Sequence, residues 1–102
     1  MSLPDIGPLL TSADFEPHVG KVFQVDAQPK PVEIRLEKIE QGRYDTGLTR
    51  PPFVLIFSSP WTVLLVSALY RMRPTGGRPV EVFLIPTQTA AGDRRYYHAV
   101  FN

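Results

Sequence analysis

Strict alternation of apolar and charged residues over 32–37 is the clearest pattern in the chain. Such alternation is typical of a β-strand that buries one face and wets the other. The phase slips at Lys38, where an apolar residue is due, and Ile39 follows one position late. A β-bulge near Glu37-Lys38 would restore the inward face, so we predict a kinked strand over 32–40.

The rest of the chain carries further strand signals separated by turn residues. The run 53–57 is apolar on both faces, which favours a central strand that ends at Ser58-Ser59-Pro60. Alternation returns over 68–73 and places Tyr70 and Met72 on one side of the strand. Together the predicted strands are 21–26, 32–40, 53–57, 68–73, 80–85 and 95–101.

Helical signals are few. Ser12 is a good N-cap, Asp14 adds negative charge to the first turn, and Gly20 offers a stop. We therefore predict one or two helical turns over 12–19. Residues 61–67 fit either a short helix or irregular chain.

Six short strands with turn-rich connections predict a mainly β fold. We expect an antiparallel sheet, either a meander or curled into a small or partial barrel, with the short N-terminal helix covering an open end. The domain spans 11–102, residues 1–10 form a loose lead-in, and Met1-Ser2-Leu3 resembles a vector-derived leader. The predicted core comprises Phe15, Val22, Ile34, Leu36, Phe53, Leu55, Phe57, Val82, Leu84, Val100 and Phe101.

Composition supports a single globular domain. The chain has 102 residues, of which 43% are hydrophobic, and its 11 prolines are spread along it as strand punctuation. No run approaches a membrane span, so no membrane partner is expected. The lack of cysteine excludes disulfides and thiol chemistry, and with the lack of a secretory signal it fits a cytoplasmic location.

No residue pattern predicts catalysis, a metal site or a cofactor. The two histidines, His18 and His98, lack metal-ligand spacing and are expected to be structural. The serines have no nucleophile motif around them, although a spatial triad stays open at this stage. Gly76-Gly77 precedes a strand rather than a helix, so it predicts a hairpin turn and not a phosphate loop.

Arginines and tyrosines near the C-terminus form a candidate basic patch. Arg94 and Arg95 precede two tyrosines, as on surfaces that bind single strands, and Arg71 and Arg73 would join them if the last three strands pack together. A net charge of +1 and the ordinary use of arginine at sheet edges argue against nucleic acid.

The apolar run from Trp61 to Leu69 is a candidate interface. If it is exposed, its large side chains would anchor a partner or a second subunit. If it is buried, it caps the core. The candidate interface residues are Trp61, Leu64, Leu65 and Leu69.

Two terminal motifs resemble a family of short bacterial proteins of unknown function. The motifs are ADFEPHVGKVF at 13–23 and YHAVFN at 97–102, and between them RPPFVLIF and EVFLIP are similar to the family's middle strands. The resemblance covers 11–102, but residues 61–67 replace the polar loop expected there. It implies no activity or site residues. Some members of that family are encoded beside phage-tail-collar-like proteins, so the resemblance implies an accessory role in an assembly.

These observations together favour a non-enzymatic interaction or assembly module whose partner is a protein, either a second copy or another chain. A role accessory to a phage-tail-like structure is the specific form of this expectation. The alternative is a small-ligand-binding β-barrel, which would need an enclosed cavity of about 300 Å³ or more.

Overall fold

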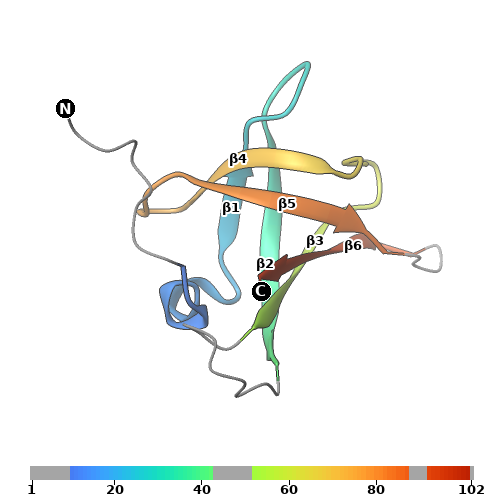
Figure 1. The fold of residues 1–102 in the computed structure, drawn as a ribbon. Coiled ribbons are helices and arrows are strands. Elements are labelled where there is room, and N and C mark those ends of the chain that lie inside the picture. The colour runs from blue at the N-terminus through green and yellow to red at the C-terminus, as the bar shows by residue number, and fades with distance from the viewer. Residues whose placement is uncertain (1–9, 43–51, 88–91, 102) are drawn as a thin grey trace.

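A computed structural model describes residues 10–42, 52–87 and 92–101 of the chain. The predicted vector leader, nearly all of the lead-in and residues 43–51 of the polar segment between the second and third predicted strands fall outside the described residues. Leu10 is half-buried and packs against the core. Six strands wrap into a barrel (Figure 1): β1 (Val22–Val25), β2 (Val32–Gln41), β3 (Phe53–Pro60), β4 (Ala68–Pro74), β5 (Val80–Pro86) and β6 (Arg94–Phe101).

The barrel closes because β1 pairs with both β2 and β4. The strand order is β1-β2-β3-β6-β5-β4, and every pair is antiparallel. The prediction of an antiparallel β barrel is confirmed, whereas a simple meander is wrong. A meander would pair β3 with β4, but β3 instead takes β6 as its neighbour along eight residues.

The predicted bulge lies where the hydrophobic phase slips. Leu36 pairs with Phe57 and Lys38 pairs with Ile56, so Glu37 is the extra residue of β2. Strand β3 runs on through Pro60 instead of ending after Phe57. Its two serines are fully buried and hydrogen-bonded, which lets polar residues continue the strand.

Two 3-10 turns, η1 (Ser12–Asp14) and η2 (Glu16–His18), stand where a short helix is predicted. Thr11, and not Ser12, is the N-cap, and its backbone N–H donates to the Asp14 carboxylate at 2.7 Å. Within the described ranges no helix has the length and apolar character needed to cross a bilayer.

Inward-facing residues from all six strands fill the barrel. Phe23, Phe57 and Tyr97 are fully buried, and Phe23 meets Phe57 edge to face with ring centroids 5.2 Å apart. Packed side chains are how small barrels occupy their interior. Phe15, between the two 3-10 turns, is buried beside Phe53 and so covers one end of the barrel.

Three predicted core residues are placed differently. Val22 and Val100 are exposed because their strands bury the neighbouring positions, Phe23 in β1 and Ala99 in β6. Phe101 is half-buried at the barrel end. Adjacent residues of a strand point to opposite faces, so Val100 and Phe101 cannot both face the interior.

Candidate functional site

Large apolar side chains lie on the outside of neighbouring strands. Leu69 on β4 is 58% exposed, and Phe83 on β5 and Val100 on β6 are each 51% exposed. Half-buried Val54, Ile56 and Ile85 lie at outward positions of β3 and β5. We call these six residues the outer apolar face.

Strand pairing joins the residues of the outer apolar face into two groups, which meet at His98. Leu69 pairs with Phe83 across β4 and β5, and Val54 pairs with Val100 across β3 and β6. His98 lies between Ile56 and Ile85, because it pairs with both. Contiguous exposed apolar surface marks interaction sites on proteins that otherwise bury such residues.

Charged residues bound the outer apolar face on both sides. On β2, Lys38 and Glu40 form an ion pair of 3.2 Å, and they pair with Ile56 and Val54 in register. On the other side, Arg71 of β4 lies opposite Glu81 of β5. An apolar centre with a charged rim is the arrangement found in protein interfaces.

The candidate interface predicted from the sequence is partly exposed and partly buried. Leu64 and Leu69 are exposed, with Leu64 at 59%, whereas Leu65 is buried and Trp61 is half-buried. The connection 61–67 is irregular rather than helical. Only Leu69 belongs to the outer apolar face, because it lies on β4 and not in the connection.

Tyr97 fixes the connection 61–67 against the core. Its hydroxyl lies 2.9 Å from the Ser59 hydroxyl and 3.2 Å from the Val63 carbonyl, and it accepts from the Leu65 N–H at 3.2 Å. Buried polar groups without partners are costly, so this network explains why Leu65 is held inward.

The candidate basic patch separates into two pairs of arginines. Arg95 lies over the Trp61 ring at 4.0 Å and donates to the Trp61 carbonyl at 2.7 Å. Arg94 donates to the Ser58 hydroxyl at 2.7 Å. Strand β6 joins β5 at Tyr97 and Pro86, whereas Arg71 pairs with Glu81 toward the other end of β5, so Arg94 and Arg95 do not form one surface with the arginines of β4.

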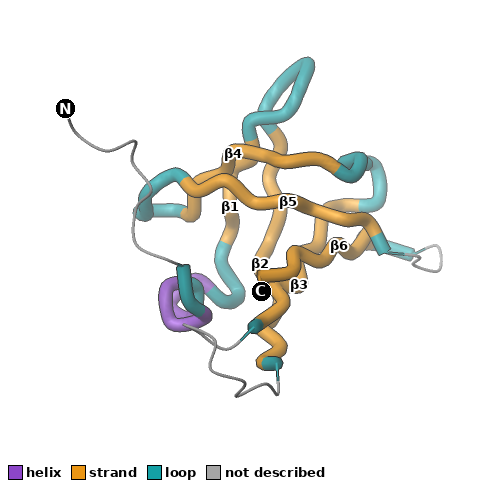
Figure 2. Tube along the Cα trace, viewed as in Figure 1, coloured by secondary structure: helices purple, strands orange, loops and turns teal. Residues whose placement is uncertain are grey.

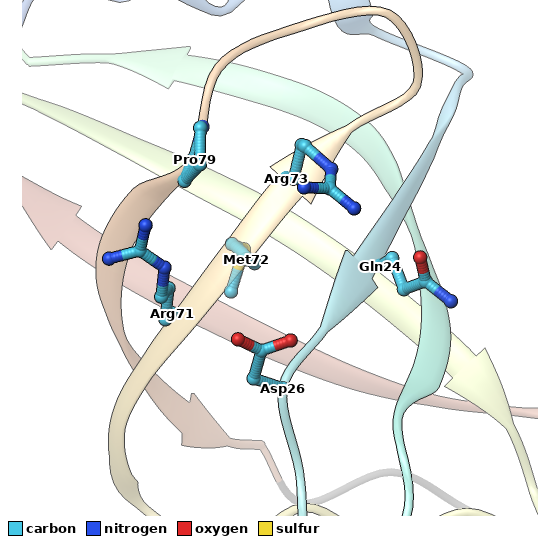
Figure 3. Close-up of a pocket in the computed structure, with 6 residues that line it drawn as sticks. All are labelled: Gln24, Asp26, Arg71, Met72, Arg73 and Pro79. Atoms are coloured by element: carbon cyan, nitrogen blue, oxygen red, sulfur yellow. The ribbon is translucent and has the colours of Figure 1, made fainter.

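Arg71 and Arg73 line a shallow exterior pocket with Gln24 and Asp26 of the β1 side (Figure 3). Its volume is about 60 Å³, well below the roughly 300 Å³ of ordinary small-molecule sites. The Asp26 carboxylate also lines the pocket, so the charge there is not purely positive.

Glu37, the bulge residue, is the centre of a polar cluster that the sequence analysis missed. Its carboxylate accepts hydrogen bonds from the Ser58 hydroxyl and from Arg35 Nε, the latter at 2.8 Å, and Arg94 Nε lies 3.9 Å away. A bulge re-aims a side chain, and here it turns Glu37 toward β3. The phase slip was the available signal, but nothing local indicated its partners.

The cluster has a structural role, because its side chains bond to one another across β2, β3 and β6. Ser58 is fully buried, donates to Glu37 and accepts from Arg94, so its hydroxyl is already occupied in both roles. Partial burial would raise the pKa of Glu37. Hydrogen bonds from Ser58 and Arg35, together with the charges of Arg35 and Arg94, outweigh burial and hold that pKa below its ordinary value.

We therefore expect acid to weaken the fold partly through Glu37. A lowered folded-state pKa contributes stability above the unfolded pKa, and that contribution is lost as pH falls through the folded pKa. Urea unfolding of the wild type and of Glu37→Gln, from neutral to acid pH, should show a smaller acid loss in the variant. The expected difference is about 1 kcal/mol or less, since the carboxylate is partly solvated.

The control is Glu40→Gln, whose carboxylate lies in the exposed pair with Lys38. If Glu37→Gln and the wild type lost stability in parallel on acidification, Glu37 would not be the source of the pH dependence.

The two histidines occupy separate structural environments. His18 lies in η2 and meets Phe23 edge to face at 5.9 Å, and His98 is half-buried on the outer side of β6. In the parts of the chain that the structure describes, no group of three or more metal-ligating side chains comes together.

Comparison with known proteins places the chain in a family. The model of the family described as a domain of unknown function (DUF6916) matches residues 10–101, nearly the whole chain. No curated protein and no solved structure matches the chain. The chain therefore belongs to the DUF6916 family, in agreement with the predicted membership of a family of unknown function.

Proposed function

We propose that the chain is a non-enzymatic interaction module that docks a protein partner on its outer apolar face. The observation that carries this proposal is the exposure of Leu69, Phe83 and Val100, each more than half accessible, on three adjacent strands. Burial of such side chains is the main favourable term in protein association.

Two further observations support interaction over the alternative of a small-ligand-binding barrel. The interior positions are occupied by large buried side chains such as Phe57 and Tyr97. The exterior pocket at Arg71 has a volume of about 60 Å³, which suits an ion or water rather than an organic ligand.

The test compares two serine variants as bait in affinity capture from an extract of the source organism. The face variant carries Leu69→Ser, Phe83→Ser and Val100→Ser. The matched loop variant carries Leu64→Ser and Val66→Ser, which are 59% and 63% exposed but lie in the connection 61–67. We expect the amount of captured partner to be at least about tenfold lower with the face variant than with the wild type. The loop variant should capture as much as the wild type.

The loop variant also tests the interface predicted from the sequence. Loss of the partner by the loop variant, with retention by the face variant, would contradict the proposal and place docking on the connection 61–67. Both variants must first give the wild-type circular dichroism spectrum and melting temperature, because misfolding would mimic a docking defect.

An accessory role in a phage-tail-like structure is the specific form of this proposal that the sequence resemblance implies. A tail component among the partners that depend on Phe83 would support that form. If the captured partners are unrelated to phage tails, the proposal of an interaction module is kept and the phage-tail role is rejected.

A further inference from the structure

The β5–β6 ladder stops before either strand ends. Among the described residues, β5 pairs with β6 only at Ile85↔His98 and Pro86↔Tyr97. Residues 80–84 continue β5, and Ala99 and Val100 continue β6, with no ladder pair between these two stretches. Figure 2 shows the two strands close together near their connecting loop and farther apart toward the start of β5. We call the unpaired stretch the β5–β6 seam.

Within the part of the chain that the structure describes, main-chain groups on the two sides of the seam have no ladder partner across it. Thr87 donates its N–H to the Tyr96 carbonyl, and Ile85 pairs with His98, so the hydrogen-bonding positions of β5 toward β6 recur every two residues. Glu81 and Phe83 are the next such positions on β5, and Val100 is the next on β6. An unpaired strand edge is a template for pairing with another extended chain.

The side chains beside the seam are apolar and exposed. Phe83 and Val100 flank it, each 51% exposed, and Leu69 lies next to Phe83 on β4. An extended peptide along β5 would cover these side chains at alternate positions while its main chain satisfied the free edge. A globular surface could cover the side chains but would leave the edge groups without partners.

Charge at the seam limits which peptide fits. Glu81 is exposed two residues from Phe83, on the same face of β5. Arg71 lies opposite Glu81 on β4, yet within the described ranges the Glu81 carboxylate forms no ion pair. A basic side chain beside Glu81 would complement it.

We propose that the β5–β6 seam binds an extended segment of a partner protein as an added β-strand along β5. That segment carries an apolar side chain beside Phe83 and a basic side chain beside Glu81. The inference rests on the proposed function and adds to it the mode of docking and the chemistry of the partner.

The first experiment measures amide hydrogen exchange by NMR in the free protein. Phe83 and Val100 should exchange fast, because their N–H groups are directed into the seam. Leu84 and Ala99 are matched controls in the same strands, paired with Ala68 and Leu55, and should be protected. Core-level protection of Phe83 and Val100 at every protein concentration would overturn the proposal. Protection that rises with protein concentration would assign the seam to a second copy and would also overturn it.

The second experiment titrates a short synthetic peptide into the labelled protein. Every second residue of the peptide is alternately valine or lysine, with serine between them, so that valine and lysine share one face and can lie beside Phe83 and Glu81. We expect the Phe83 and Val100 amides to shift and become protected. A peptide of the same sequence, N-methylated at alternate residues, should bind at least about tenfold more weakly, since it cannot donate to the β5 edge. Equal affinity for the two peptides, or shifts confined to other strands, would overturn strand addition.

A third arm tests the charge. Glu81→Gln should weaken binding of the valine–lysine peptide by about two- to fivefold and leave unaffected a control peptide with serine in place of each lysine. Equal weakening of both peptides would overturn the basic preference. If neither peptide binds at the β5–β6 seam but the face variant still loses its natural partner, the proposal of strand addition is wrong and the proposed interaction function is retained. If the face variant keeps its partner, the proposed function itself fails.

Discussion

Replacing Tyr97 with alanine is expected to lower the free energy of unfolding by about 3–5 kcal/mol, the range for removing a buried aromatic side chain. Tyr97 is fully buried in the barrel. Its loss would leave a cavity, would remove the hydrogen-bond partner of the Leu65 N–H, and would leave the Ser59 hydroxyl with its bond to the Val63 carbonyl but without the bond to Tyr97. Urea unfolding followed by circular dichroism measures the change.

Tyr97→Phe separates the ring from the hydroxyl. It keeps the packing and removes only the polar network, so we expect a smaller loss of about 1–2 kcal/mol. The Leu65 amide should then exchange faster, because the connection 61–67 loses its anchor to β6. If Tyr97→Phe were as damaging as Tyr97→Ala, the ring would add little and the packing argument would be wrong.

Replacing Phe53 with alanine is expected to cost about 3–5 kcal/mol as well, for a different reason. Phe53 is 1% exposed and stacks on Phe101 with ring centroids 4.7 Å apart. It also contacts Phe15, whose ring centroid is 6.0 Å away, so one side chain joins the 3-10 turns to two strands. The variant should lose both the core contact and the cover at this end of the barrel.

Phe83→Ala is the matched control for Phe53→Ala. The substitution is chemically identical, but Phe83 is 51% exposed on the outer apolar face, so the stability change should stay within about 0.5 kcal/mol. Both are measured by the same urea titration. A large loss at Phe83 would mean that this side chain serves the fold rather than docking.

Local patterns predicted the strands because the alternation within each strand shows which of its residues are buried. The alternation over 32–37 fixed the inward face of β2, and the phase slip at Lys38 located the bulge. Alternation also separated Tyr70 and Met72 from the outward side of β4. Burial of one face is strongly specified in a strand, since a shift of one residue exchanges the faces.

Barrel closure and the polar cluster could not be predicted in the same way. The Glu37–Ser58 bond joins residues 21 positions apart, and Arg94 reaches Ser58 from 36 positions away. Such partners depend on strand order, and local periodicity does not contain strand order. The β1–β4 pairing that closes the barrel is nonlocal for the same reason.

The outer apolar face was partly within reach of the sequence. Val82 and Leu84 belong to the predicted core, and the two-residue period of a strand places Phe83, which lies between them, on the outward side. Val100 was missed because it was counted with Phe101 as core, against the two-residue period of the strand. Only the pairing of β4 with β5 and of β3 with β6 brings Leu69, Phe83 and Val100 onto adjacent strands.

The pairing of β3 with β6 sets an order of events for the chain as it is synthesised. Strand β3 is apolar on most positions, and its ladder partner on one side comes from residues 94–101. Until those residues leave the ribosome, that edge of β3 has no native neighbour and is open to aggregation. Slowing translation before residues 94–101 leave the ribosome should therefore lengthen chaperone occupancy of the nascent chain.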